Sequence, residues 1–468
     1  MTEPEPDLLA VVRGSVSAPA GCGKTELIAR AIVRQGGDKP ILVLTHTNAG
    51  VVALRQRLDR MGVRPSVYRL STIDGWAMRL IATFPARSGH DPAILKLSNP
   101  GQDYPAIRCA ALRLLQARHL DSVLACTYAR LIVDEYQDCS VPQHGLVCEA
   151  ARVLPTCVLG DPLQAIFGFN EALAGWDEVC ATFPLQGELS IPWRWHRVDA
   201  YDLGAWLLDV RRLLLASHPI DLRNAPSRVT WIHLDGTDDH ARRLRACRTS
   251  SDHPDGGVLI IGDMRPASHR SFASRTPGAV TVESVDLRDV VTFARGFDVA
   301  GRDVLERLVG FADEVMTGLG GAELVKRVHI HRRGTARVPP TEAELATLAF
   351  LRAPTNAGAA ELLATLNRQT GVRVHRPTIL RGVIRALQTS GSGSLHDAAL
   401  RVREENRLLG RPLPKRAVSS TLLLKGLEAD VAVILDASAL SRANLYVAMT
   451  RGCCKLVICS KTPVLQPA

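Results

Sequence analysis

The sequence predicts an α/β protein with doubly wound parallel sheets, and two observations carry that prediction. Strand-like apolar runs alternate with helix-like segments early in the chain, and further strand-like runs follow later. One early run leads into a glycine-rich loop that opens a helix-like segment, which is the context of a phosphate-binding loop. A length of 468 residues suggests two or more domains, and an apolar content of 46% is enough for buried cores.

The elements follow in order along the chain. The first strand-like runs cover residues 8–16, 41–45, 130–134 and 156–160, with helix-like runs at residues 26–33, 49–60 and 73–82. A second set of strand-like runs covers residues 228–233, 257–262, 431–436 and 455–460. Because strands that alternate with helices join as βαβ units, the pattern favours parallel sheets. The segment between these later runs is expected to be mostly helical, with loops or hinges at residues 339–340 and 390–394.

The glycine-rich loop has the sequence APAGCGKT and ends at Thr25. Gly21 and Gly23 let backbone N–H groups approach a polyphosphate closely, and the loop ends at a helix N-terminus, where the dipole favours anions. Lys24 can reach the β- and γ-phosphates, and the Thr25 hydroxyl can hold Mg²⁺. Taken alone, the stretch could also be a chance glycine-rich turn. The nucleotide-binding residues expected in the loop are Ala20, Gly21, Cys22, Gly23, Lys24 and Thr25.

Two adjacent carboxylates follow the strand-like run at residues 130–134. Asp134 is expected to bind Mg²⁺, usually through water, and Glu135 to orient and deprotonate the attacking water. Neighbouring acids can divide these roles because side chains alternate in direction along an extended segment. Two acids after a strand are often only a solvated turn, but a preceding phosphate-binding loop favours the catalytic interpretation.

Six motifs along the chain resemble those of the UvrD/Rep/PcrA-type superfamily 1A DNA helicases, in the same order. They are APAGCGKT at residues 18–25, DEYQD at 134–138, VLGDPLQAIFGF at 158–169, SIPWR at 190–194, KGLE at 425–428 and LYVAMTR at 445–451. Together they span nearly the whole chain, so the resemblance does not depend on any single match.

The resemblance implies two RecA-like P-loop NTPase domains with ATP bound between them and a small helical domain inserted in each. The first core would comprise residues 1–84 and 125–192, and its small insert residues 85–124. The second core would comprise residues 193–298 and 415–468, and its reduced helical insert residues 299–414.

The resemblance also implies roles for residues in these motifs, with ATP and Mg²⁺ as cofactors. Gln164 would sense the γ-phosphate, and Arg194 and Arg451 would act as arginine fingers whose planar charge suits phosphate oxygens. Trp193 would stack on the adenine, although core packing is the alternative for this residue, and Glu428 would support the nucleotide or Mg²⁺ region. The predicted catalytic residues are Lys24, Asp134, Glu135, Gln164, Arg194 and Arg451, with Thr25 and Asp134 as metal ligands.

DNA contacts are expected from three segments that resemble those of the family, which contain residues 45–48, residue 72 and residues 167–169. His46 replaces the phenyl ring of the family's TFTN motif but can still stack on a base. Phe167 and Phe169 would also stack on bases, which tolerates any sequence, although both could instead pack beneath the motif. The DNA-binding residues expected are Thr45, His46, Asn48, Thr72, Phe167 and Phe169.

Composition agrees with a nucleic-acid partner. The net charge is +10 and the isoelectric point is near 9.2, which suits a polyanion. The 11 cysteines form no CxxC pair, which argues against a zinc site and favours reduced thiols in a cytoplasmic protein. The acidic residues 1–7 do not resemble a signal peptide, and no apolar run is long enough to span a membrane.

Three departures from the family pattern affect the expected activity. Fewer than twenty residues precede the loop and none is the Gln that reads adenine in relatives, so base selectivity is expected to be loose. Leu422 replaces a polar His, which removes one expected strand contact. The second insert is also small, so strand separation is less expected than ATP hydrolysis or movement along single strands.

The sequence therefore favours an ATP-dependent DNA translocase or helicase acting on single-stranded or tailed DNA in the 3′→5′ direction. The alternative is a DNA-sensing ATPase subunit that regulates a partner nuclease, as a resemblance to the compact UvrD-like subunit of Gabija-type phage-defence systems would imply. A degenerate relative that binds DNA without turnover is a third possibility, against which the intact motifs argue. The pathway, DNA repair or antiviral defence, stays open at this point.

Overall fold

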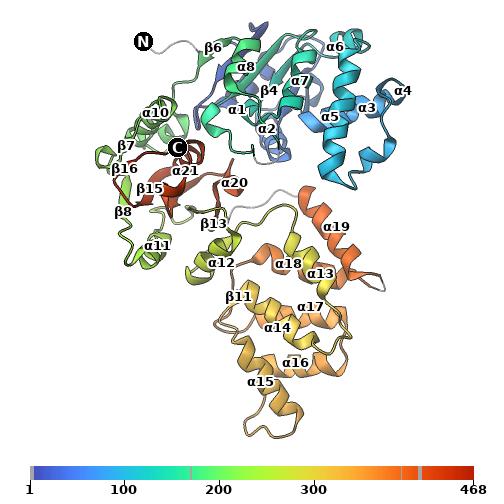
Figure 1. Cartoon of the computed structure of the whole chain (residues 1–468), viewed down its shortest axis with the longest axis vertical. Coiled ribbons are helices and arrows are strands. Elements are labelled where there is room, and N and C mark those ends of the chain that lie inside the picture. The colour runs from blue at the N-terminus through green and yellow to red at the C-terminus, as the bar shows by residue number, and fades with distance from the viewer. Residues whose placement is uncertain (1–4, 169–170, 392, 409–413, 468) are drawn as a thin grey trace. The chain divides into compact units, whose positions relative to one another are not determined.

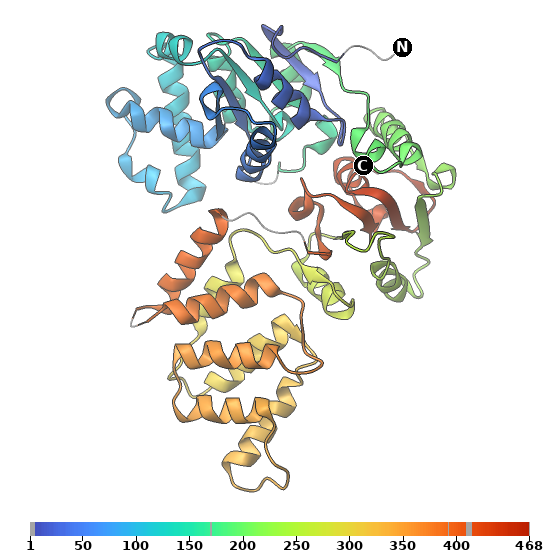
Figure 2. The same cartoon turned by 180° about the vertical axis from the view of Figure 1, so that it is seen from behind.

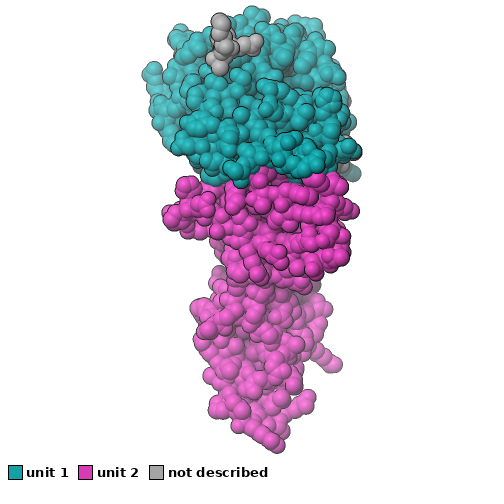
Figure 3. Space-filling model, turned by 90° about the vertical axis from the view of Figure 1, so that its left-hand side faces the viewer, with its two compact units in different colours: residues 1–228, 440–454, 464–468 teal, residues 229–439, 455–463 magenta. Residues whose placement is uncertain are grey.

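The computed structural model describes residues 5–168, 171–391, 393–408 and 414–467, and it divides into two compact units (Figure 3). Unit 1 contains residues 1–228, 440–454 and 464–468, and unit 2 contains residues 229–439 and 455–463. Each unit contains a six-stranded sheet. Every helix within the described ranges is too short or too polar to cross a bilayer.

The sheet of unit 1 is parallel and has the strand order β3-β2-β4-β5-β1-β6 (Figure 1). Non-consecutive neighbours in this order mean that crossover connections join the strands, as in a doubly wound sheet. The strands are β1 (Arg13–Ser17), β2 (Ile41–Thr45), β3 (Tyr68–Thr72), β4 (Arg130–Val133), β5 (Thr156–Gly160) and β6 (Leu185–Glu188).

Helices cover both faces of this sheet, because successive strand residues point to opposite faces. Ile41 and Val43 pack in one apolar cluster with α1 (Lys24–Arg34) and α2 (Asn48–Arg60). Leu42 and Leu44 pack in a second cluster with α3 (Ile73–Thr83), α7 (Val141–Ala150) and α8 (Trp176–Thr182). The prediction of a doubly wound α/β sheet is therefore confirmed for this unit.

The predicted strand at residues 8–16 is wrong in its first half. Leu8 and Val11 are buried, but they enter the core from a turn in which Ala10 N–H donates to the Asp7 carbonyl. The strand itself begins only at Arg13. Burial, not strand pairing, therefore accounts for the first apolar residues of this run.

Residues 85–124, predicted as a small insert, are helical and pack on the first sheet layer. They form α4 (Pro85–Ser88), a 3₁₀ turn (Pro92–Lys96), α5 (Pro100–Gln116) and the start of α6 (Asp121–Thr127). Apolar residues of α5 share one core cluster with those of α3 and α7. This segment thus has no apolar core of its own among the described residues.

Unit 2 contains the second sheet, with the order β10-β13-β9-β14-β15-β8. β9 pairs in parallel with both β13 and β14, and β15 pairs in parallel with β8. The strands are β8 (Val229–His233), β9 (Val258–Gly262), β10 (Val280–Thr281), β13 (Arg416–Ser420), β14 (Ala429–Ile434) and β15 (Gly452–Ser460). Together, the two parallel sheets with flanking helices make two RecA-like domains, as predicted.

A helical bundle interrupts the second sheet between β10 and β13 (Figure 2). Its helices share one apolar core, which includes Leu287 and Val290 and so starts before the predicted boundary at residue 299. They are α13 (Arg288–Gly296), α14 (Val304–Val315), α15 (Gly321–Arg332), α16 (Glu342–Arg352), α17 (Asn356–Asn367), α18 (Pro377–Thr389) and α19 (Leu395–Leu408). The short strands β11 (Met316–Thr317) and β12 (Arg373–Val374) pair within it.

Several segments expected in the second core belong to unit 1. They are α9 (Trp193–His196), α10 (Tyr201–Leu215), α21 (Arg442–Met449) and the antiparallel pair β7 (Ile220–Asp221) and β16 (Val464–Leu465). The motifs that contain Arg194 and Arg451 therefore belong to the same compact unit as the glycine-rich loop.

Candidate functional site

The glycine-rich loop runs from the end of β1 to the start of α1. Gly21 and Gly23 have φ values of 74° and 88°, a region that residues with a Cβ rarely adopt. A Cβ built at Gly21 would lie 2.6 Å from the Trp195 ring, and one at Gly23 would lie 3.0 Å from Trp193. Both backbone conformation and space therefore require glycine, which leaves backbone N–H groups exposed to a ligand.

Two predicted catalytic acids contact the loop lysine. The Lys24 ammonium lies 3.0 Å from Asp134 Oδ1 and 2.6 Å from Glu135 Oε1. The strand order explains this convergence, since β1 and β4 are both neighbours of β5 and all three end at the same edge of the sheet. Glu135 has a positive φ of 55°, a costly conformation for a non-glycine residue that often occurs at functional sites.

The charges at this contact shift the pKa values of Lys24 and Asp134. Burial alone would lower the pKa of Lys24, but the charges of Asp134 and Glu135 raise it above its ordinary value. Burial raises the pKa of Asp134, and Glu135 adds to this rise while Lys24 opposes it. The lysine therefore stays protonated and keeps its charge for a negatively charged ligand.

Gln164, the predicted γ-phosphate sensor, belongs to the same hydrogen-bond network as Glu135. The Gln164 side-chain N–H donates to Asp161 Oδ2 at 3.1 Å. Gln137 accepts from the Asp161 backbone N–H at 3.1 Å and donates to Glu135 Oε2 at 2.5 Å. Three hydrogen bonds, through Gln137 and Asp161, therefore connect the predicted base with the predicted sensor.

The WRW segment of α9 packs on the glycine-rich loop. Trp195 is 1% exposed and donates its indole N–H to the Gly452 carbonyl at 3.0 Å, so core packing accounts for it. Trp193 is 42% exposed and lies beside Gly23, which leaves its ring available to a nucleotide base. The Arg194 backbone N–H donates to the Gly21 carbonyl, and its guanidinium donates to the Thr450 carbonyl at 2.6 Å.

α21, which carries the YVAMTR motif, also reaches the loop. The Tyr446 hydroxyl accepts a hydrogen bond from the backbone N–H of Ala20 at 3.1 Å. Arg451 is only 2% exposed and donates to the Val447 carbonyl and to the Thr450 hydroxyl. The two predicted arginine fingers therefore both contact Thr450, at the end of α21.

The predicted stacking of the nucleotide base on the exposed Trp193 ring has a consequence for nucleotide selectivity. Stacking on Trp193 separates adenine from guanine poorly, whereas buried hydrogen-bond readout discriminates strongly. We expect GTP to support hydrolysis within about tenfold of ATP, a difference of roughly 1.4 kcal/mol. Steady-state hydrolysis of the two nucleotides measures this. A preference for ATP beyond about a hundredfold would mean that another residue reads the base.

Several predicted DNA-binding residues lie together at the carboxyl ends of β2 and β3. Thr45 and Thr72 are paired in register, and the Thr72 hydroxyl accepts from Gly75 N–H at the start of α3. The His46 and Phe167 rings lie 5.5 Å apart, and Asn48 is exposed at the start of α2. Phe169 lies outside the described residues.

Glu428, predicted to support the nucleotide region, lies in unit 2. It is exposed on the loop between α20 (Thr421–Leu424) and β14, two residues after Gly426, whose φ is 81°. Its proposed role depends on the arrangement of the two units and stays a prediction.

No disulfide joins cysteines within the described part of the chain, and the redox state of the thiols stays a prediction. Cys22 lies within the glycine-rich loop, where burial raises the pKa of its thiol to about 12. The thiol is therefore neutral at physiological pH, and Cys22 contributes to the loop through its backbone and its packing.

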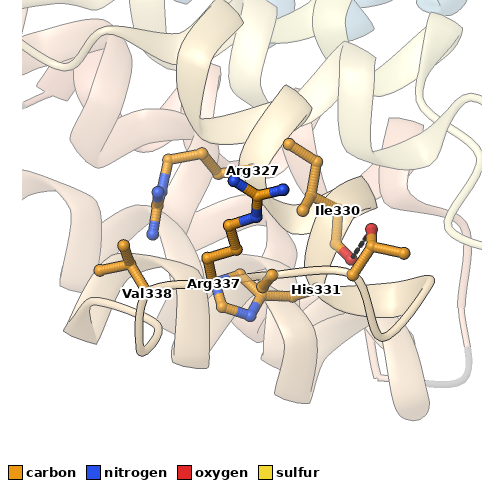
Figure 4. Close-up of a pocket in the computed structure, with 7 residues that line it drawn as sticks. Arg327, Ile330, His331, Arg337 and Val338 are labelled. Atoms are coloured by element: carbon orange, nitrogen blue, oxygen red, sulfur yellow. Dashed lines mark hydrogen bonds between the residues drawn. The ribbon is translucent and has the colours of Figure 1, made fainter.

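The helical bundle of unit 2 contains a pocket of about 240 Å³ that none of the predicted site residues lines (Figure 4). It lies along the end of α15 and the loop that follows, where Arg327 pairs with Glu344. Its lining residues are Arg327, Ile330, His331, Thr335, Ala336, Arg337 and Val338.

The structure adds one buried residue that the motifs did not indicate. Arg211 of α10 contacts Asp161, Ser17 and Glu188, next to the glycine-rich loop. A signal was present, because Arg211 occupies the helix face that Leu207 and other apolar residues bury. A charged side chain at such a position requires partners.

Comparison with known proteins identifies one segment of the chain. Residues 95–175 match the family model for the UvrD/REP helicase N-terminal domain. This segment runs from the insert through Asp134 and Glu135 to just beyond Gln164. No curated protein matches the chain.

Two solved structures are among those that resemble the chain. The complex of Arterivirus nonstructural protein 10 (helicase) with DNA has a TM-score of 0.27 and 11% identity, covering 54% of this chain and 48% of that one. The Pif1 helicase from Candida albicans has a TM-score of 0.29 and 15% identity, covering 59% of this chain and 54% of that one. This chain thus matches about half the length of each. The family match thus shows that residues 95–175 are similar to the UvrD/REP helicase N-terminal domain.

Proposed function

We propose that the protein is an ATP-dependent motor that moves along single-stranded or tailed DNA in the 3′→5′ direction. The observation that carries this proposal is the contact of Lys24 with both Asp134 and Glu135 beside a loop that only glycines can form. This arrangement can bind a triphosphate, hold a metal ion and activate water, which are the requirements of phosphoryl transfer to water.

The residues present suit both ATP and Mg²⁺. The left-handed conformations of Gly21 and Gly23 lead the loop into the N-terminus of α1, where the helix dipole favours phosphate, and the Thr25 hydroxyl and the Asp134 carboxylate are oxygen donors of the kind that Mg²⁺ prefers. When bound, Mg²⁺ would neutralise charge on the phosphate oxygens. Lys24 would exchange its carboxylate partners for phosphate oxygens, which frees Glu135 to accept a proton from water.

The remaining motif residues would complete the site. Gln164, held by Asp161 through one amide N–H, would contact the γ-phosphate with the other, and Arg194 and Arg451 would offset the negative charge of the transition state. Trp193 would stack on the base, and Glu428 would support the nucleotide region from unit 2.

We propose that the DNA strand binds at the carboxyl ends of β2 and β3. The sugar–phosphate backbone would be contacted by Thr45, Asn48 and Thr72, and the bases would stack on His46 and Phe167. Phe169 would extend this set. The net charge of +10 would attract the phosphates, so binding should weaken as salt rises.

The test is ATP hydrolysis with and without single-stranded DNA. We expect DNA to stimulate hydrolysis, because Phe167 and Gln164 belong to one short segment. Phe167→Ala should lower the stimulation, since stacking is worth about 1–3 kcal/mol per base. Phe167→Trp keeps a stacking ring and should keep the stimulation. Equal hydrolysis with and without DNA, across salt concentrations, would contradict the proposal.

A DNA-sensing ATPase that regulates a partner nuclease would use the same ATP site and the same DNA contacts. It differs from a motor in one measurable property, which is movement along the strand. We favour the motor. If DNA stimulated hydrolysis but the protein did not move along the strand, the protein would instead be an ATPase that senses DNA.

A further inference from the structure

Arg211 joins the ends of three neighbouring strands. Its Nε lies 3.2 Å from Asp161 Oδ1, its Nη2 donates to the Ser17 hydroxyl at 3.0 Å, and its Nη1 contacts Glu188. Ser17 ends β1, Glu188 ends β6 and Asp161 directly follows β5, and these three strands are adjacent in the order β5-β1-β6. Arg211 itself is 4% exposed, so α10 seals this edge with a buried charge.

Asp161 is the partner that connects Arg211 with the ATP site. Its carboxylate is fully buried and accepts hydrogen bonds from the Gln164 side chain and from Leu163 N–H. Burying a carboxylate without a cation is costly, and within the described part of the chain Arg211 is the only cationic side chain that pairs with Asp161.

Other titratable groups lie near this pair. Burial raises the pKa of Tyr446 well above its ordinary value, and burial with the Asp161 charge raises that of Cys22 to about 12, while the charges of Arg211 and Arg194 oppose the rise at Cys22. Glu188 contacts Arg211 from β6, and its side chain is about half exposed. Arg211 therefore supplies the positive charge that directly contacts the buried Asp161 carboxylate.

The position of Asp161 determines how it holds Gln164. Its carboxylate accepts a hydrogen bond from the N–H₂ end of the Gln164 amide, and this contact sets the orientation of the amide. A displaced carboxylate would lose that hydrogen bond. The orientation of the sensor amide thus depends on Arg211, whose guanidinium contacts the same carboxylate.

We propose that Arg211 is a positioning residue for ATP hydrolysis, which acts by fixing Asp161 and, through it, the orientation of the Gln164 amide. The proposal rests on the proposed function, since it assigns Arg211 to the γ-phosphate sensor of that site. Ser17 extends the same contact to the strand that enters the phosphate-binding loop.

The test is DNA-stimulated ATP hydrolysis by full-length Arg211→Gln, Arg211→Lys and the wild type, with kcat and KM measured separately. Without the cation, the buried Asp161 carboxylate loses the partner that fixes it. We expect kcat of Arg211→Gln to be at least about tenfold below wild type, with KM for ATP little changed. Arg211→Lys keeps the charge and should recover most of the wild-type kcat.

Further variants separate this role from a merely structural one. Arg211→Gln combined with Asp161→Asn should have about the same kcat as Asp161→Asn alone, because both changes act through the same contact with Gln164. Ser17→Ala removes another Arg211 contact and should keep the wild-type kcat. If Arg211→Gln does not fold, Asp161→Asn alone must still lower kcat with KM unchanged.

The outcomes distinguish the two proposals. A wild-type kcat for Arg211→Gln would overturn the positioning role, as would a loss of kcat in Arg211→Lys as large as that in Arg211→Gln. A wild-type kcat for Asp161→Asn would overturn it as well. A wild-type protein without ATPase activity would instead overturn the proposed function.

Discussion

Glu135→Gln is expected to lower ATP turnover by about 10²–10⁴-fold, the usual contribution of a general base, while ATP still binds. The amide cannot accept a proton from water, but Lys24 and Asp134 keep their places for phosphate and Mg²⁺. Single-turnover hydrolysis measures the loss, and a fluorescent ATP analogue measures binding.

The control is Glu149→Gln on α7, whose carboxylate pairs with Arg152 and should not affect turnover. Lys24→Ala gives a useful contrast, because it removes a phosphate contact and leaves Asp134 and Glu135 without their cation. It should therefore weaken ATP binding as well as turnover. Wild-type hydrolysis by Glu135→Gln would mean that the base has been assigned to the wrong residue.

Arg451→Ala and Arg194→Ala are expected to lower turnover by about 10³–10⁵-fold each, the range for an arginine finger. Both guanidinium groups contact Thr450, and both would have to turn from protein acceptors towards the phosphates. Lysine in either position keeps the charge but not the planar fork, so it should recover only part of the rate.

Thermal unfolding of the same variants is the control, since Arg451 is buried and its hydrogen bonds to Val447 and Thr450 stabilise the end of α21. A folded Arg451→Lys variant with a reduced rate would support the finger role. Turnover within about tenfold of wild type for folded alanine variants at both positions would exclude it.

Local sequence pattern predicted the sheet well where apolar runs are short and clearly bounded. β2 and β5 have the predicted bounds, residues 41–45 and 156–160. The start of the strand predicted at residues 8–16 was wrong, because Leu8 and Val11 are buried in the core but lie before the strand begins at Arg13. Periodicity alone does not separate these two causes of burial.

The predictable part of the site is the part that motifs encode. Lys24, Asp134 and Glu135 were all predicted to belong to the ATP site, and the structure places both carboxylates within 3.0 Å of the Lys24 ammonium. The sequence could not identify the partner of Arg211, because its contact with Asp161 depends on the adjacent positions of β5, β1 and β6 in the folded sheet. Tyr446 was part of a recognised motif, but its hydrogen bond to Ala20 depends on tertiary packing in the same way.

Movement along DNA is the central claim, and displacement of streptavidin from end-biotinylated single-stranded DNA tests it most directly. We expect ATP-dependent release of streptavidin from the 5′ end, faster than from the 3′ end, and no release with Glu135→Gln. Release only from the 3′ end would reverse the proposed direction. DNA-stimulated hydrolysis without release from either end would contradict a motor and favour an ATPase that senses DNA.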